Sequence, residues 1–304
     1  MKKLLFVFNP HSGKGKIRNT LFDIVDIFTK ADYEVTIHPT QEKNDCADKI
    51  RQRGEAFDLV VVSGGDGTLN EAVRGMLSMD KDKRLPIGYI PAGTMNDFAA
   101  GNGIPKATKV AAEAIVRGET VKYDIGIFNE CAFIYVAAFG AFTDVSYDTP
   151  QAKKNIFGSA AYLIEGIKRI PQIEGINVRI KTIEGEELEE EVLWCFIMNS
   201  SSVAGIEIGD FYQIDTNDGV FELVLIPKSP NIIDYAAVIS DIKNGKRDAD
   251  GVRVISTRGA EIITEKPVRW TLDGEYGGET DAVSFSVAHD AVEFILNKGK
   301  ENIN

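Results

Sequence analysis

Hydrophobic and polar positions follow two different patterns along this chain, and the change falls near Tyr123. Before it, continuous apolar runs such as residues 4–8 and 59–62 are separated by stretches with apolar residues at helical spacing. A continuous apolar run is typical of a strand that is buried on both faces of a parallel sheet. The pattern predicts stacked βαβ units, which bind ligands at the carboxyl ends of their strands. The predicted strands cover 4–8, 33–37, 59–62 and 87–90, and the predicted helices cover 17–28, 69–77 and 109–117, with another around Lys49.

After Tyr123, short segments alternate between apolar and polar residues, and turn signals such as Asn217-Asp218-Gly219 separate many of them. This pattern predicts a β-sandwich-like domain. Apolar stripes at 156–170 and 233–242 predict two helices within it, and the acidic stretch 184–191 is typical of a solvated hairpin. We therefore predict an α/β domain with a parallel sheet over residues 1–122, and a β-rich domain over 123–304 whose C-terminal tail could return to the first.

Composition narrows the classes of partner. The length of 304 residues fits two domains. The net charge of −12 argues against binding to nucleic acid, for which the protein would need a basic face. It does not argue against binding of a phosphate, which main-chain N–H groups and a metal ion can hold. Three cysteines and three histidines, widely scattered, are too few for a disulfide framework or a zinc site. The longest uncharged apolar run, 131–142, is shorter than the roughly 20 residues of a membrane-spanning helix, so we expect a cytoplasmic protein.

A glycine-rich turn, Gly64-Gly65-Asp66-Gly67-Thr68, follows the third predicted strand and opens a helix. Its glycines let the main chain approach a ligand, and the helix start offers unpaired N–H groups to a phosphate. The carboxylate of Asp66 would repel a bare phosphate unless it holds Mg²⁺ or accepts a proton from a hydroxyl. The turn therefore indicates phosphoryl transfer. The plainer alternative is a tight turn capped by Asp66, which does not explain three glycines in four positions.

Two further turns follow the first and fourth predicted strands, where the same sheet edge would bring them close to the glycine-rich turn. Residues 9–16 carry Lys14 and Lys16 and no acid, which makes either a positive patch for a phosphate or an ordinary basic loop. Residues 91–99 contain Asp97 at a helix start. The two turns would supply a second set of main-chain donors and another carboxylate.

In this order the three turns resemble the diacylglycerol kinase catalytic-domain family, in particular its small bacterial soluble lipid kinases. The family's Asn-Pro-x-Ser/Ala-Gly, Gly-Gly-Asp-Gly-Thr-x-Asn-Glu and Gly-Thr-x-Asn-Asp-Phe-Ala motifs stand here at 9–13, 64–71 and 93–99. The resemblance continues at 123–126, 217–219 and 272–275, so it covers nearly the whole chain. Gly-Gly-Asp-Gly alone also occurs in NAD kinases and phosphofructokinases, whereas the full ordered set is specific. The resemblance implies an NAD kinase/diacylglycerol kinase-like fold for the first domain.

The same resemblance implies a kinase that transfers the γ-phosphoryl group of ATP, with Mg²⁺, to a lipid hydroxyl, most simply that of diacylglycerol or a related lipid. Asp66 would act through Mg²⁺ or water, supported by Asp97 and Asp124. Asp273, with Glu275 two residues on, would take the proton of the acceptor hydroxyl, although either acid could be the base. The implied nucleotide-binding residues are Asn9, Ser12, Gly13, Lys14, Thr40, Gly64, Gly65, Asp66, Gly67, Thr68, Leu69, Asn70, Gly93, Thr94, Asn96, Asp97 and Asp124.

A second, structural Mg²⁺ is implied at the Asn217-Asp218-Gly219 turn. Asp218 would be a side-chain ligand, and Asp215 and Val220 would offer main-chain carbonyls. The plainer interpretation of this turn is a hairpin without a metal. Asp124 could likewise serve only to cap a junction between domains.

Other functions stay open at this point. An NAD kinase-like phosphotransferase would use the same Asp-containing turn, and a regulatory module would bind nucleotide without turnover. The sequence also leaves the identity of the lipid and a homodimer open. We expect a transient encounter with the lipid at a membrane surface. Basic residues around the 156–170 stripe could form that surface, although a buried stripe with solvated ends is the simpler interpretation; they are Lys153, Lys154, Lys168 and Arg169.

Overall fold

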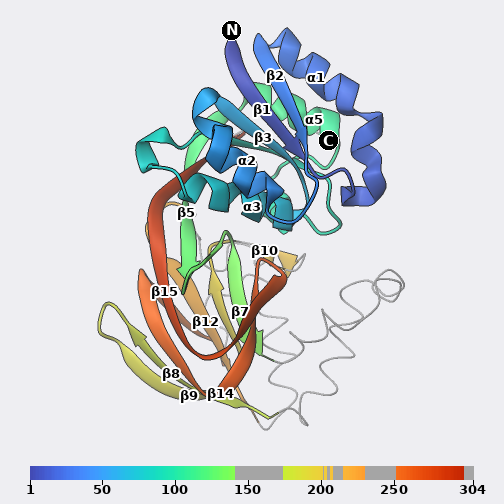
Figure 1. Cartoon of the computed structure of the whole chain (residues 1–304). Coiled ribbons are helices and arrows are strands. Elements are labelled where there is room, and N and C mark those ends of the chain that lie inside the picture. The colour runs from blue at the N-terminus through green and yellow to red at the C-terminus, as the bar shows by residue number, and fades with distance from the viewer. Residues whose placement is uncertain (141–173, 201, 204–205, 208–214, 230–250, 298–304) are drawn as a thin grey trace. The chain divides into compact units, whose positions relative to one another are not determined.

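The computed structural model (Figure 1) describes residues 1–140, 174–200, 202–203, 206–207, 215–229 and 251–297. The predicted helices at 156–170 and 233–242, and the basic residues around the first of them, lie outside these ranges. The chain divides into two compact units. The first unit comprises Met1–Ile125 and His289–Asn304, and the second unit comprises Gly126–Ala288.

The first unit is built on a parallel sheet with the strand order β4-β3-β1-β2. Every residue of β3 and β4 is buried, as predicted for strands covered on both faces. The last part of β15 joins the same sheet, since Phe294 pairs in parallel with Ile87 of β4. The strands are β1 (Lys2–Phe8), β2 (Tyr33–Pro39), β3 (Leu59–Gly64) and β4 (Ile87–Pro91).

Helices connect these strands and bury their apolar sides. Ile24 and Phe28 of α1 pack with Ala111 and Ile115 of α5 against one face of the sheet, where Phe6 also lies. The predicted helix at 17–28 begins later than expected, because residues 12–19 form a 3₁₀ turn, and the predicted helix at 69–77 begins earlier, at Asp66. The helical segments are η1 (Ser12–Asn19), α1 (Leu21–Lys30), α2 (Asp45–Arg53), η2 (Gly54–Ala56), α3 (Asp66–Leu77), η3 (Lys81–Lys83), α4 (Asp97–Gly101) and α5 (Thr108–Arg117).

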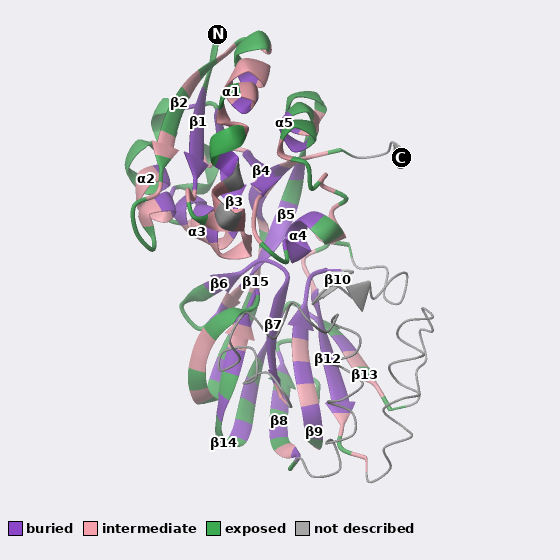
Figure 2. Ribbon diagram, turned by 90° about the vertical axis from the view of Figure 1, so that its right-hand side faces the viewer, coloured by how far each residue is buried: buried purple, intermediate pink, exposed green. Residues whose placement is uncertain are grey.

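The second unit is mainly antiparallel. Its strands follow the order β13-β12-β9-β7-β14-β15, and β8 pairs with both β9 and β14. Buried and exposed residues alternate along β14 (Figure 2), and the buried ones share one core with Phe139 and Phe221. The sandwich-like packing of this unit stays a prediction. The strands are β5 (Glu119–Phe128), β6 (Cys131–Phe133), β7 (Val136–Gly140), β8 (Ile176–Thr182), β9 (Glu187–Met198), β10 (Ser202–Val203), β11 (Ile206–Glu207), β12 (Phe221–Pro227), β13 (Arg253–Thr257), β14 (Gly259–Leu272) and β15 (Glu275–Leu296).

The acidic stretch 184–191 is the solvated hairpin that the sequence predicts, because it joins β8 to β9 with Lys181 opposite Glu187. Glu184 in its turn receives hydrogen bonds from the Thr257 hydroxyl and from the main chain and side chain of Arg258. Partial desolvation acts to raise the pKa of Glu184, but these donors outweigh it and lower the pKa to about 2. The ionised carboxylate therefore ties the hairpin to the junction of β13 and β14.

We expect Glu184→Gln to lower the free energy of unfolding by about 1 kcal/mol at pH 7, since the site is exposed and screening limits the gain. A folded-state pKa below the unfolded value stabilises the fold above about pH 4.3 and loses this contribution as the pH falls towards 2. Denaturant unfolding at a series of pH values should show the difference from wild type vanish across that window. Glu186→Gln, in the same turn, is the control and should leave the pH profile unchanged.

Within the described residues, no helix has both the length and the apolar character needed to cross a bilayer.

Candidate functional site

Four turns meet at the carboxyl edge of the parallel sheet. The N–H of Asn9, just after β1, donates to the Ser63 carbonyl at 2.9 Å, and the N–H of Thr40, just after β2, donates to the Phe8 carbonyl at 2.9 Å. The N–H of Ala92, after β4, donates to the Gly64 carbonyl at 2.7 Å. The structure thus brings together the turns that carry most of the predicted nucleotide-binding residues.

Glycines allow these turns to touch one another. Gly13 has φ +57°, and a Cβ there would collide with the Ala92 carbonyl. A Cβ on Gly93 would stand 2.5 Å from the Cα of Gly65, whereas a Cβ on Gly65 would stand an ordinary 3.4 Å from the Cα of Gly93. The main chains after β3 and β4 therefore lie in direct contact, with room for a side chain on only one of the two facing glycines.

The two facing glycines give a matched pair of variants. We expect Gly93→Ala to lower the free energy of unfolding by about 1–3 kcal/mol, because the new methyl group meets main-chain atoms that cannot move separately. Gly65→Ala should cost much less, since its methyl group fits. Thermal and denaturant unfolding of both variants would check this, and equal stabilities would contradict the close approach.

Asp66 links the glycine-rich turn to the turn after β4. It is the first residue of α3, and its carboxylate accepts the N–H groups of Asp97 at 3.3 Å and Phe98 at 3.4 Å, so it caps α4 from a distance. Burial raises the pKa of Asp66, the neighbouring Asp97 charge raises it further, and the main-chain donors oppose both effects. Asp97 itself is 8% exposed. A partly buried carboxylate beside a buried one suits a hard divalent cation, which would neutralise both.

Asn96 holds the turn after β4 in shape. Its backbone is left-handed, with φ 54°, and its side-chain oxygen accepts the Gly93 N–H at 2.8 Å while its amide donates to the Gly93 carbonyl at 3.0 Å. The buried Tyr89 hydroxyl donates to the Gly64 carbonyl at 3.1 Å. The side chain of Asn96 is thus engaged within the protein, whereas Thr94 and Met95 of the same turn are exposed.

Several other predicted site residues have structural partners. The side chain of Asn70 accepts a hydrogen bond from Arg74 at 3.1 Å, and the following Glu71 accepts the Asn44 N–H at 2.8 Å, which fastens α3 to the start of α2. Leu69 is fully buried, so only its main chain could face a ligand. Ser12 opens the 3₁₀ turn after Asn9 and Gly67 lies in the first turn of α3. The side chain of Lys14 lies outside the part of the chain that the structure describes.

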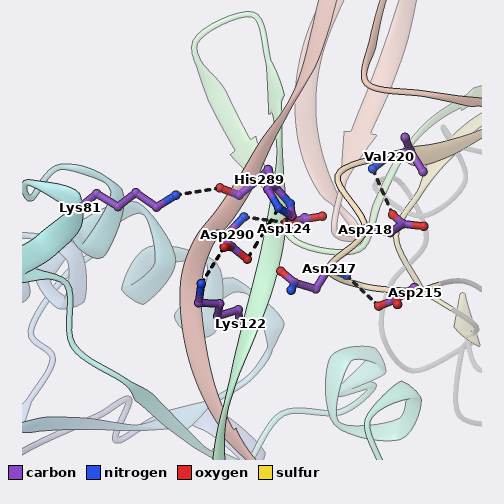
Figure 3. Close-up of polar contacts among 9 residues, drawn as sticks. All are labelled: Lys81, Lys122, Asp124, Asp215, Asn217, Asp218, Val220, His289 and Asp290. Atoms are coloured by element: carbon purple, nitrogen blue, oxygen red, sulfur yellow. Dashed lines mark hydrogen bonds and ion pairs between the residues drawn. The ribbon is translucent and has the colours of Figure 1, made fainter.

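Asp124 lies on β5 (Figure 3) and is fully buried. Its Oδ1 is 2.9 Å from Nδ1 of His289 and accepts the N–H of Asp290 at 2.7 Å, both from the end of β15. Of the described residues, Asp124, His289 and Asp290 form a group close enough to share a cation. Sequence reasoning missed His289, because no local spacing connects it to a residue 165 positions away.

Asp273 lies at the turn between β14 and β15, with φ 50° and 4% of its surface exposed. Its carboxylate accepts three main-chain N–H groups, from Ile134 at 2.8 Å, Tyr135 at 2.9 Å and Val136 at 3.2 Å. Main-chain N–H groups are the partners that a buried carboxylate requires, and a carboxylate is the group that could accept the proton of a hydroxyl. Glu275, two residues on, is exposed.

The predicted structural metal site falls on the loop before β12 (Figure 3). Oδ1 of Asp215 accepts the Asn217 N–H and Oδ1 of Asp218 accepts the Val220 N–H, each at 3.1 Å. Glu222 follows at the start of β12, 7% exposed, with no hydrogen-bond partner for Oε2 among the described residues. Burial raises the pKa of Glu222 to about 7, and the charge of Asp218 adds to the effect. Carboxylate and carbonyl oxygens of this kind are the donors that Mg²⁺ prefers, so the residues present fit the ion.

Comparison with known proteins gives consistent matches. The family model of the diacylglycerol kinase catalytic domain matches residues 3–128. A diacylglycerol kinase of Staphylococcus aureus (strain MRSA252) is 33% identical over 284 residues, which cover 92% of this chain and 88% of that protein.

Solved structures show the same fold. A diacylglycerol kinase from Bacillus anthracis str. Sterne has a TM-score of 0.75 at 20% identity, with 98% of this chain and 97% of that chain covered. Yeast NADH kinase complexed with NADH has a TM-score of 0.50 at 12% identity, with 98% and 84% covered. The kinase-like fold predicted for the N-terminal part is therefore confirmed at the level of architecture.

Proposed function

This chain belongs to the diacylglycerol kinase family, and from that premise we propose that it transfers the γ-phosphoryl group of ATP, with Mg²⁺, to the hydroxyl of a lipid. Diacylglycerol or a related lipid is the proposed acceptor, met transiently at a membrane surface by a cytoplasmic enzyme. The observation that carries the proposal is the pair formed by Asp66 and Asp97 where the glycine turns meet. Passive phosphate binding gives no reason to place two acids there, whereas metal-assisted transfer does.

The chain's own residues have separable roles in this reaction. The main-chain N–H groups of the turns after β1, β3 and β4 would hold the phosphates, as helix starts and glycine-rich loops do elsewhere. Asp66 and Asp97 would hold Mg²⁺ with support from Asp124, and the bound ion would neutralise charge on the transferred phosphoryl group. Asp273, with Glu275 two residues on, would take the proton of the acceptor hydroxyl. The loop with Asp215, Asp218 and Val220 would hold a second, structural Mg²⁺.

An NAD kinase-like phosphotransferase is the second candidate, because yeast NADH kinase shares the fold. The turn from Gly93 to Ala99 and the acids Asp273 and Glu275 favour the lipid kinase, since the sequence matches that family at both places. A regulatory module without turnover is the weakest candidate. Such a module would not need Asp66, Asp97, Asp124, Asp273 and Glu275 together.

One assay separates these functions. The purified protein is given labelled ATP, Mg²⁺ and, in turn, diacylglycerol, a sphingoid base and phosphatidylglycerol in mixed micelles, and then NAD in solution. We expect γ-phosphate transfer to at least one lipid and none to NAD. Transfer to NAD alone would establish the second candidate, and ATP binding without transfer to any acceptor would establish the regulatory module.

A further inference from the structure

The C-terminal end of β15 supplies a histidine to a buried carboxylate of the first unit. Asp124 has no exposed surface. Its Oδ1 lies 2.9 Å from Nδ1 of His289 and also accepts the N–H of Asp290 at 2.7 Å (Figure 3). Because an ionised carboxylate only accepts hydrogen bonds, we assign the ring proton to Nδ1 in this contact. The ring itself is half exposed. His289 therefore has one nitrogen committed to Asp124, while the ring remains accessible to solvent.

We infer that His289 is a positioning residue for Asp124, fixing the carboxylate that serves the Mg·ATP site. The inference rests on the proposed function, in which Asp124 supports that site. A buried carboxylate needs donors for its lone pairs, and each donor also fixes the plane of the group. Partners of this kind, which contact a metal-site acid rather than the metal, commonly change metal affinity or activity by roughly 10- to 100-fold when removed.

The segment that carries His289 is itself fastened within the first unit. Lys81 donates to the His289 carbonyl at 3.1 Å, and Arg84 donates to the Ala291 carbonyl at 2.7 Å. Lys122, two residues before Asp124 on β5, pairs with the Asp290 carboxylate at 2.7 Å. Cationic side chains from the η3 region and from β5 thus hold the chain at His289 and at the two residues that follow it. These contacts hold the imidazole of His289 in one position against Asp124.

These contacts also favour positioning over metal binding by the group itself. Asp290 already has a cationic partner in Lys122, and a divalent ion would have to compete with that ammonium group for the carboxylate. Oδ1 of Asp124 is occupied by two donors. His289 therefore acts through Asp124, with its Nδ1–H as the functional atom.

Three substitutions of one residue test this. Asparagine places an amide nitrogen where Nδ1 stands, glutamine places one near Nε2, and alanine removes both. We expect His289→Ala and His289→Gln to weaken Mg·ATP binding and lower kcat/KM roughly 10- to 100-fold, and His289→Asn to restore most of the loss. Isothermal titration with Mg·ATP supplies a readout that is independent of the lipid, and kcat and KM are measured separately over a range of Mg²⁺ concentrations. Melting temperatures are recorded for all three variants.

The outcomes are distinct. If His289→Gln kept the Mg·ATP affinity and kcat/KM of the wild type while His289→Asn lost them, the ring would work through Nε2, and the inference would be overturned. Lower melting temperatures with unchanged Mg·ATP affinity would also overturn it, because the contact would then serve only stability. If the wild-type protein phosphorylates no lipid, the proposed function fails, while the order of Mg·ATP affinities among the variants still decides the role of His289.

Discussion

Replacing Asp273 with asparagine is expected to lower turnover on lipid by roughly 10²- to 10⁴-fold while leaving Mg·ATP binding nearly intact. The amide that replaces the carboxylate cannot take a proton from the acceptor hydroxyl. Asp273 belongs to the second unit, whereas the turns that we propose hold the nucleotide belong to the first. A steady-state assay of lipid phosphorylation, paired with a Mg·ATP titration, would measure the two effects separately.

The surroundings of Asp273 add a second expected effect. Its Oδ1 accepts the N–H groups of Tyr135 and Val136, and its Oδ2 accepts that of Ile134. In the asparagine variant the side-chain oxygen can replace one carboxylate oxygen, but the amide nitrogen then faces a main-chain N–H. We expect this donor–donor conflict to cost about 1–3 kcal/mol of folding free energy. Turnover must therefore be expressed per folded molecule, from unfolding curves of the same samples.

Glu275→Gln is the matched control for Asp273→Asn. Glu275 is exposed, so its substitution should leave stability unchanged. If Asp273 is the base, Glu275→Gln should keep most of the turnover. If folded Asp273→Asn kept full turnover and Glu275→Gln lost its turnover, Glu275 would be the base. Asp273 would then serve to hold the turn between β6 and β7.

The fold was predictable from sequence where one signal dominated. Continuous apolar runs identified β1, β3 and β4, because strands buried on both faces leave no polar positions. Helix starts were less predictable. Ile17 fits the apolar spacing of α1 yet lies in a 3₁₀ turn, since Gly13 and Gly15 with positive φ angles shape the chain just before it. Periodicity reports which side chains are buried, not which main-chain hydrogen bonds form.

The candidate site was predictable only in part, for a related reason. Glycine-rich turns stand out locally, so Asp66 and Asp97 could be singled out and the sheet edge brought them together. The capping of α4 by Asp66 and the contact between His289 and Asp124 are long-range, and a single sequence carries no signal for either. Asn70 shows the opposite case: it belongs to the motif, yet its side chain bonds Arg74.

Asp66 gives the other prediction with a large effect. We expect Asp66→Ala to abolish phosphoryl transfer and weaken Mg·ATP binding, because one of the two acids proposed to hold the metal is lost. Alanine also removes the acceptor for the N–H groups of Asp97 and Phe98. Loss of a helix cap costs about 0.5–2 kcal/mol, so this variant should be less stable as well as inactive.

Asp66→Asn separates the charge of Asp66 from its capping role. The asparagine oxygen can still accept one of the two N–H groups at the start of α4, although the amide nitrogen then faces the other, and the repulsion from Asp97 disappears. Since burial and that neighbouring charge both disfavour the ionised Asp66, removal of the charge offsets the lost hydrogen bond, and the asparagine variant should be more stable than Asp66→Ala without Mg²⁺. The asparagine variant should nevertheless be inactive, because the two negative charges that destabilise the fold are the ones that we propose hold the metal.

Added Mg·ATP turns this contrast into a decisive measurement. A ligand that binds only the folded state raises stability by about 2.7 kcal/mol at one hundred times its dissociation constant. Wild type should therefore melt at a higher temperature with Mg·ATP, while Asp66→Asn and Asp66→Ala should gain little. A Mg²⁺ dependence in Asp66→Asn equal to that of wild type would remove Asp66 from the metal site. Asp66 would then be left with the role its hydrogen bonds already define, the fastening of α4 to the glycine-rich turn.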